Sequence, residues 1–178
     1  MTNISSNLAN AASLLWAMFH SLPAPLNRVN WAGFYVRSDL FPSPKRSGDT
    51  RTAPVELLLA PFAGLPACQS IPLPPPGSSR SPGVCAAAFL SGETQIVPDV
   101  EKRPGHIACD AKTRSEIVVP IRVNSADNGD GSVVGVLDID CETENGFDEM
   151  DRAALEEIAA KIAMALSLIH ISEPTRPY

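Results

Sequence analysis

The two strongest strand signals of the chain follow one another closely, and they limit the folds that it can adopt. Residues 116–123 (EIVVPIRV) and 132–139 (SVVGVLDI) are rich in β-branched side chains. The segment between them, NSADNGDG, contains Asn-Gly and Asp-Gly steps, which favour hairpin turns. We therefore expect these two segments to form an antiparallel pair of strands inside a sheet.

Weaker signals place further elements around this pair. Helices are predicted at residues 7–20 and 84–90, and strands at residues 31–36, 55–60 and 95–98. The expected apolar face of the helix at 7–20 consists of Leu8, Ala11, Ala12, Leu15 and Phe19. A last helix is predicted to begin at Asp148, the expected N-cap, with Asp151 three residues on. Its expected apolar face consists of Met150, Ala154, Leu155, Ile158, Ile162, Ala165 and Leu166. Short strands with flanking helices predict an α+β domain built on an antiparallel sheet.

Two segments do not fit regular elements. Residues 37–54 are predicted to be a polar loop that contains several prolines. The proline-rich run at residues 72–82, PLPPPGSSRSP, is predicted to be an extended loop that is too small and polar to pack. At 178 residues the chain has the length of one domain.

The charge distribution and the apolar runs exclude several classes of protein. The formal net charge is −6, and residues 101–150 alone carry five basic and eleven acidic side chains. That balance argues against a site for nucleic-acid phosphates, although it is also what a plain acidic surface would show. No apolar run approaches the ~18 residues of a membrane span, and no signal peptide is evident. We expect a soluble, cytoplasmic protein that binds neither nucleic acid nor membrane.

Four cysteines, at positions 68, 85, 109 and 141, leave two interpretations open. None of them forms a Cys-x-x-Cys pair, which argues against a zinc ribbon and against a thioredoxin-like motif. Buried, inert thiols and redox-active thiols both remain. Cys109 follows a Pro104-Gly105 turn and stands close to His106, an environment that can favour the nucleophilic thiolate.

Acidic residues recur at the ends of the two strongest strands. Asp138 and Asp140 are two residues apart, so they should point to the same face of their strand. Glu116 stands at the start of the other strand. An acidic site for a cationic group and a solvated strand end are both compatible with this pattern.

Four sequence blocks, taken in order, resemble one protein family. NWAGFY (30–35), PGHIACD (104–110), SEIVVP (115–120) and GVLDID (135–140) closely resemble the free methionine-(R)-sulfoxide reductases, which are stand-alone GAF domains. The resemblance implies a GAF-like antiparallel β-sheet flanked by helices. It implies a single domain over residues 5–168 with insertions near 37–54 and 71–82, followed by a tail at 169–178 that is unlike the family.

The resemblance also implies an activity and the roles of three cysteines. The family reduces free methionine-(R)-sulfoxide to methionine, without a metal or an organic cofactor. By position in the matching blocks, Cys109 resembles the nucleophile, Cys68 the resolving cysteine and Cys85 a third redox cysteine. A thioredoxin-like reductant would recycle the disulfide, and a homodimer is left open.

The same resemblance implies a set of pocket residues. Trp31 and Tyr35 match the aromatic residues of the family, and Glu116, Asp138 and Asp140 match its acidic residues. Without the resemblance, Trp31 and Tyr35 would be read as core side chains on one face of a strand. Two other functions stay open: a GAF-type sensory module that binds a small ligand, and an inactive, truncated homologue.

Overall fold

The computed structural model of the protein describes residues 4–40, 54–75, 77–79, 81–105, 110–123 and 131–171, with side chains of the last helix as far as residue 165. The helices in this part of the chain are α1 (Ile4–Ser21), α2 (Val84–Ser91) and α3 (Glu149–Ile171), with short 3-10 turns at Leu26–Arg28, Ser38–Leu40 and Val100–Lys102. Its strands are β1 (Val29–Arg37), β2 (Glu56–Gly64), β3 (Ser70–Pro72), β4 (Gln95–Val97), β5 (Ser115–Val123) and β6 (Ser132–Cys141).

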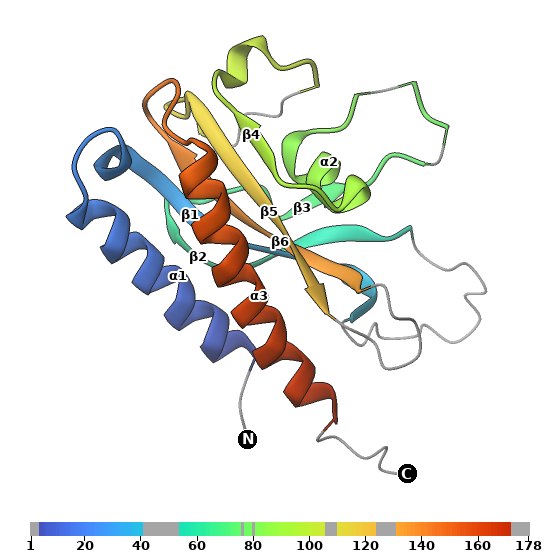
Figure 1. Ribbon diagram of the computed structural model, residues 1–178. Coiled ribbons are helices and arrows are strands. Elements are labelled where there is room, and N and C mark those ends of the chain that lie inside the picture. The colour runs from blue at the N-terminus through green and yellow to red at the C-terminus, as the bar shows by residue number, and fades with distance from the viewer. Residues whose placement is uncertain are drawn as a thin grey trace.

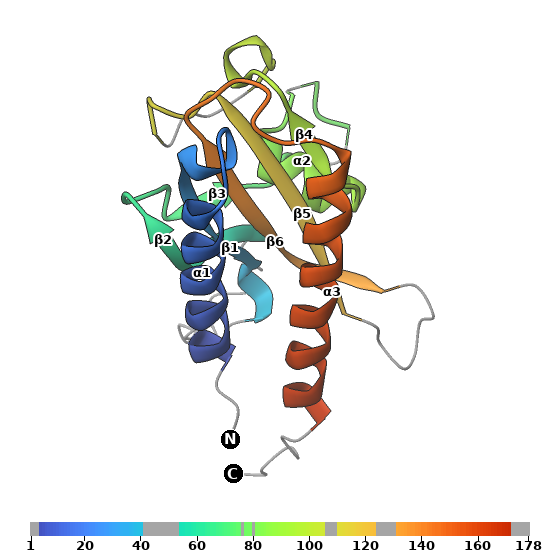
Figure 2. The same cartoon turned by 60° about the vertical axis from the view of Figure 1, so that its left-hand side comes forward.

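One antiparallel sheet with the strand order β3-β2-β1-β6-β5-β4 forms the centre of the domain. Helices α1 and α3 lie side by side on one face of the sheet, and α2 lies on the other face (Figures 1 and 2). The predicted α+β architecture on an antiparallel sheet is thus confirmed, and so is the antiparallel pairing of the two strongest strands. The turn between those strands lies outside the described residues.

Alternation along the central strands gives each face of the sheet its own core. In β6, Leu137, Ile139 and Cys141 pack under α1 and α3, whereas Val136 packs on the α2 side. Strand β1 alternates in the same way, with Phe34 toward the two long helices. Because successive side chains of a strand point to opposite faces, about every second side chain of the central strands points to the α2 side.

The two long helices agree with the sequence analysis except at the start of α1 and in part of the predicted face of α3. The predicted apolar face of α1 is confirmed: Leu8, Ala12, Leu15 and Phe19 are buried, and Ala11 is half-buried against the same core. The helix begins at Ile4, three residues earlier than predicted. In α3 the predicted face is wrong at Met150, whose side chain is 80% exposed, and at Ala154, which is exposed. At about 100° per residue, Met150 lies about 140° around the helix from the buried Leu155, so the two cannot share a face.

The second strand is longer than predicted, and a third strand was not predicted. β2 continues through Pro61 to Gly64, because a β-bulge opposite Phe34 accommodates the proline, which cannot donate a ladder hydrogen bond. β3 occupies the start of the segment expected to be a loop insertion. Leu73 of the proline-rich run packs against the core on the α2 side, so the run is not wholly unpacked as predicted.

None of the described helices is both long and apolar enough to cross a membrane. Most of the predicted polar loop, residues 41–53, lies outside the described residues, as do residues 172–178 of the predicted tail.

The start of α3 is fixed by the capping interaction predicted from the sequence. Asp148 Oδ1 accepts hydrogen bonds from the backbone amides of Met150 and Asp151, at 2.8 and 3.1 Å, and Asp151 Oδ2 accepts one from the amide of Asp148. We expect Asp148→Ala to lower the free energy of unfolding by about 1 kcal/mol, because it leaves two helix amides without this acceptor. Chemical denaturation measures the change.

Asp148→Asn serves as the matched control for this prediction. The amide oxygen of asparagine can accept the same hydrogen bonds, so this variant should keep most of the stability. An equal loss in both variants would contradict the capping explanation.

Candidate functional site

One pocket on the α2 side of the sheet gathers the residues singled out in the sequence analysis. Seven of the eight line it: Trp31, Tyr35, Cys68, Cys85, Glu116, Asp138 and Asp140. The eighth, Cys109, lies outside the described residues. The pocket therefore combines an aromatic wall, three carboxyl groups and two cysteines that are far apart in the sequence.

Strand register explains why the acidic side chains meet. Asp138 and Asp140 occupy alternate positions of β6 and face the α2 side. Glu116 of β5 pairs with Asp140 across the sheet, and Trp31 of β1 pairs with Asp140 from the other side. Neighbouring strands lie about 4.8 Å apart, so these side chains reach the same small volume.

The aromatic wall of the pocket consists of Trp31 and Tyr35, and a third ring, Phe62, stacks on Trp31. Trp31 stacks on Tyr35 with a centroid distance of 5.9 Å, and on Phe62 of β2 with one of 5.4 Å. Gly33 makes this stack possible, because a Cβ atom there would lie 2.3 Å from Phe62 Cβ and 2.6 Å from the Trp31 ring. Phe62 was missed in the sequence analysis, although a glycine inside the strand motif NWAGFY signals just such a close approach.

Tyr35 also links the aromatic wall to the cysteine segment. Its hydroxyl donates a hydrogen bond to the backbone carbonyl of Cys68 at 3.0 Å. Burial, together with the nearby acidic groups led by Asp138, raises the pKa of Tyr35, so the hydroxyl keeps its proton. The segment before the proline-rich run is thus tied to the central strand β1.

Burial raises the pKa values of the three carboxyl groups, so they are not all ionised at neutral pH. Glu116, Asp138 and Asp140 are 5%, 6% and 9% exposed. Burial raises the pKa of Asp138 to about 7, even though hydrogen bonds from Cys85 and Glu116 favour its charged form. Burial, and then repulsion from Asp138, also raise the pKa values of Glu116 and Asp140. The pocket therefore holds protonated carboxyl groups at neutral pH.

The described cysteines differ in state and place. Cys68 takes part in a disulfide, whereas Cys85 and Cys141 carry free, buried thiols. Cys85 donates from Sγ to Asp138 Oδ2 at 3.2 Å, and burial followed by repulsion from Asp138 raises the pKa of its thiol. Such a thiol stays protonated and is a poor nucleophile. Cys141 lies on the other face of the sheet, in the core under α1 and α3.

A polar network beside the pocket was not identified from the sequence. The Asn30 side-chain amide donates to Asp110 Oδ2 at 3.0 Å and to Thr113 Oγ1 at 3.1 Å. Thr113 lines the pocket, and its hydrogen bond to Asp140 favours the charged form of that carboxyl group. Asp110 directly follows Cys109 in the sequence. The network thus ties the residue after Cys109 to β1 and to the acidic cluster.

Two polar atoms of the pocket residues are buried without a hydrogen-bond partner among the described residues. They are Trp31 Nε1, a donor, and Asp138 Oδ1, an acceptor. Since buried polar groups are nearly always paired in folded proteins, these two atoms are available to an ion, a water molecule or another ligand in the pocket. Within the described part of the chain, one group of side chains could hold a metal ion, and it lies at the same place, on Cys85, Glu116 and Asp138.

The raised pKa of Asp138 predicts how stability depends on pH. Below pH about 4 the carboxyl group is protonated in both folded and unfolded protein. Between pH about 4 and about 7 the folded protein retains a proton that the unfolded chain has lost, so stability falls as the pH rises. We expect Asp138→Asn to flatten this fall in a series of thermal unfolding curves over that pH range.

Asp39→Asn is the control for this pH series. Hydrogen bonding to Arg37 lowers the pKa of Asp39, so its contribution changes only below pH about 4. This variant should keep the wild-type slope between pH about 4 and about 7. A wild-type slope in Asp138→Asn would contradict the prediction.

Comparisons with known proteins agree with this geometry. The GAF domain family matches residues 10–166. The chain is 46% identical over 156 residues to the free methionine-R-sulfoxide reductase of Saccharomyces cerevisiae, covering 88% of this chain and 72% of that protein. It is 34% identical over 166 residues to the enzyme of the same name from Escherichia coli, covering 93% of this chain and 79% of that protein.

A solved structure is similar over nearly the whole chain. The X-ray structure of free methionine-R-sulfoxide reductase from Neisseria meningitidis in complex with its substrate has 37% sequence identity and a TM-score of 0.69. The match covers 96% of this chain and 83% of that one. The chain belongs to the GAF domain family and, within it, to the free methionine-R-sulfoxide reductases.

Proposed function

We propose that the protein reduces free methionine-(R)-sulfoxide to methionine, with cysteine thiols as the source of electrons. One observation carries the proposal: the aromatic wall, the buried acidic cluster and Cys68 and Cys85 line a single pocket. The relatives that bear the name of this activity support it. Each group in the pocket has a part in recognising or reducing such a substrate.

The pocket suits both ends of the free amino acid. The stacked rings of Trp31 and Tyr35 offer an apolar surface for the S-methyl group. The carboxyl groups of Asp138 and Asp140 offer partners for the α-ammonium group, whose charge also favours the ionised form of an acid beside it. A peptide-bound or acetylated substrate lacks that positive charge. The acidic cluster thus accounts for selection of the free amino acid.

The first chemical step transfers an oxygen atom from substrate sulfur to enzyme sulfur. We assign Cys109 as the nucleophile: its thiolate attacks the sulfoxide sulfur, and the sulfoxide oxygen takes a proton as its bond to that sulfur breaks. Glu116 and Asp138 are candidate donors, because burial keeps a carboxyl proton available at neutral pH. The released oxygen then bonds to Cys109 Sγ as the bond between the two sulfurs breaks, so methionine leaves with that electron pair and Cys109 becomes a sulfenic acid.

The second step forms a disulfide and releases water. We assign Cys68 as the thiol that condenses with the Cys109 sulfenic acid, in keeping with the disulfide state of Cys68. A thioredoxin-like dithiol then reduces that disulfide by thiol exchange and restores both thiols. Cys85 remains the alternative resolving thiol, because its sulfur lies in the same pocket.

The proposal extends to the organisation of the chain and its setting. We propose that residues 5–168 form the GAF-like domain, that residues near 37–54 and 71–82 are insertions, and that residues 169–178 are a tail outside the family pattern. A thioredoxin-dependent cycle fits the reducing environment of the cytoplasm. A homodimer remains open and is accessible to light scattering.

Substrate selectivity tests the proposed recognition. The purified protein with a thioredoxin system should convert free methionine-(R)-sulfoxide, and it should act poorly on the S epimer and on the N-acetylated R compound. The acetylated compound has lost the charge that Asp138 and Asp140 are proposed to bind. Methionine and N-acetylmethionine are quantified by chromatography. Equal rates on the free and acetylated R compounds would exclude the ammonium contact.

Cysteine variants test the chemical roles. Cys109→Ser should have less than about a tenth of the wild-type activity, because a hydroxyl is a much weaker nucleophile toward sulfur than a thiolate. Cys141→Ser, which changes a buried cysteine on the opposite face of the sheet, should stay active. A Cys109→Ser protein with near-wild-type turnover would place the nucleophile elsewhere.

Cys68→Ser separates oxygen transfer from recycling. It should release about one equivalent of methionine per enzyme and then stop, because the sulfenic acid lacks its resolving thiol. Mass spectrometry of non-reduced peptides should show a Cys68–Cys109 disulfide in the wild type after turnover. Sustained turnover of Cys68→Ser, with a Cys85–Cys109 disulfide, would make Cys85 the resolving cysteine.

A further inference from the structure

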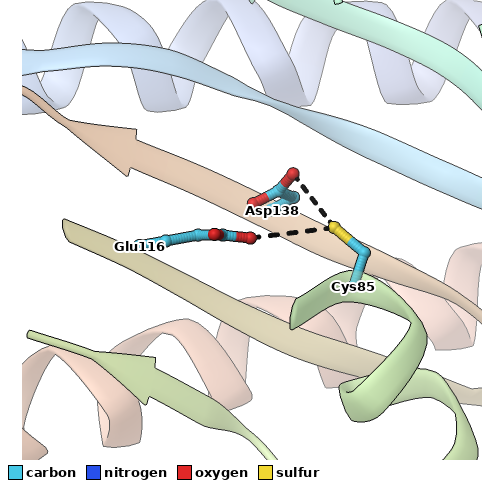
Figure 3. A group of neighbouring side chains, drawn as sticks. All are labelled: Cys85, Glu116 and Asp138. Carbon is cyan, nitrogen blue, oxygen red and sulfur yellow. Dashed lines mark hydrogen bonds between the residues drawn. The ribbon is translucent and has the colours of Figure 1, made fainter. Parts of the chain in front are cut away.

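Three side chains from three separate elements converge beside the aromatic wall. They are Cys85 in the first turn of α2, Glu116 on β5 and Asp138 on β6, and Figure 3 shows them pointing toward one another. Cys85 Sγ lies 3.2 Å from Asp138 Oδ2 and 3.9 Å from Glu116 Oε1, and one donor atom of each residue lies within 4.8 Å of the others. The cluster thus combines one sulfur and two carboxyl oxygens.

These separations match those around a tetrahedral metal ion. With a zinc–sulfur bond of about 2.3 Å and zinc–oxygen bonds of about 2.0–2.2 Å, tetrahedral angles place sulfur and oxygen ligands about 3.6 Å apart. The two observed separations of 3.2 and 3.9 Å bracket that value. Side-chain shifts of a few tenths of an ångström would bring both sulfur–oxygen separations to that value, and the two carboxyl oxygens, within 4.8 Å of each other, would close on the same ion.

A second observation points to a ligand at this place. Asp138 is 6% exposed, and its Oδ1 atom is buried with no hydrogen-bond partner among the described residues, although Asp138 lines the pocket. An ion held by Asp138 would supply an electropositive partner for this carboxylate. Since the cluster lies on the pocket wall, the fourth coordination position is available to water.

We propose that Cys85, Glu116 and Asp138 form a binding site for a thiophilic divalent cation such as Zn²⁺, and that the bound ion excludes the sulfoxide substrate. A thiolate ligand favours zinc over Mg²⁺ or Ca²⁺, which prefer six or more oxygen ligands. The exclusion half rests on the proposed function, because the ion would occupy carboxyl groups that the substrate is proposed to use. The binding half depends only on the cluster.

Metal binding is measured on the oxidised protein, in which the disulfide of Cys68 removes that thiol from competition. After dialysis against a chelator, the full chain should take up about one Zn²⁺ or Co²⁺ and should not retain Mg²⁺. Cobalt should produce the near-ultraviolet absorption band of a thiolate–cobalt bond. Zinc added afterwards should abolish that band by displacing the cobalt.

Three variants locate the site. Cys85→Ser should lose the thiolate–cobalt band, and Glu116→Gln should keep a weaker band and bind Zn²⁺ at least about tenfold less tightly. Cys141→Ser, the matched change of the other free cysteine, should keep the full band. Circular dichroism checks that each variant is folded. A folded Cys85→Ser protein that retains the band, or a wild type that takes up no zinc, would overturn the site.

An experiment with added substrate distinguishes failure of this proposal from failure of the proposed function. Free methionine-(R)-sulfoxide, added to the cobalt-loaded oxidised protein, should reduce the thiolate–cobalt band in a concentration-dependent way. An unchanged band in a protein that turns over the sulfoxide would overturn the exclusion half. A protein that binds zinc at Cys85 but never reduces the sulfoxide would refute the proposed function and leave the metal site standing.

Discussion

The rest of the site depends on one constraint, the two-sided burial of strand β6. Its odd-numbered residues Leu137, Ile139 and Cys141 are held in the core beneath α1 and α3, and this contact fixes the register of the strand. Asp138 and Asp140 must then point to the opposite face. Because α2 and the segment around Cys68 cover that face, the two carboxyl groups are buried rather than solvated.

Burial of acidic side chains on a central strand disfavours their ionised form, and the proposed reaction uses the protons that they retain. Three carboxyl groups in one pocket cannot all be ionised, so the pocket holds protons at neutral pH that free carboxylic acids would lose. The same cluster is therefore the proposed source both of a proton for oxygen transfer and of a negative site for an ammonium group. The same desolvation keeps the Cys85 thiol protonated, which separates it from the proposed nucleophile, Cys109.

The sequence analysis predicted regular elements well where apolar residues follow a clear period. The strand pair β5–β6, the buried face of α1 and the Asp148 cap all appear as predicted. It was less accurate at two places. β2 continues through Pro61 by means of a bulge, and Met150 in the first turn of α3 lies outside the buried stripe of that helix. Local periodicity does not reveal a bulge opposite another strand, whereas the 100° helical period itself places Met150 off the stripe that contains Leu155.

The sequence by itself determined the strand alternation, and hence that Asp138 and Asp140 share a face with one another. It also supplied the motif blocks that identify the family. Only the tertiary structure decided that this face is enclosed, since α2, β2 and β5 bring Cys85, Phe62 and Glu116 to it from distant parts of the chain. Burial, pKa shifts and metal-like ligand spacing are properties of that enclosure, and they exist only when the separate segments pack together.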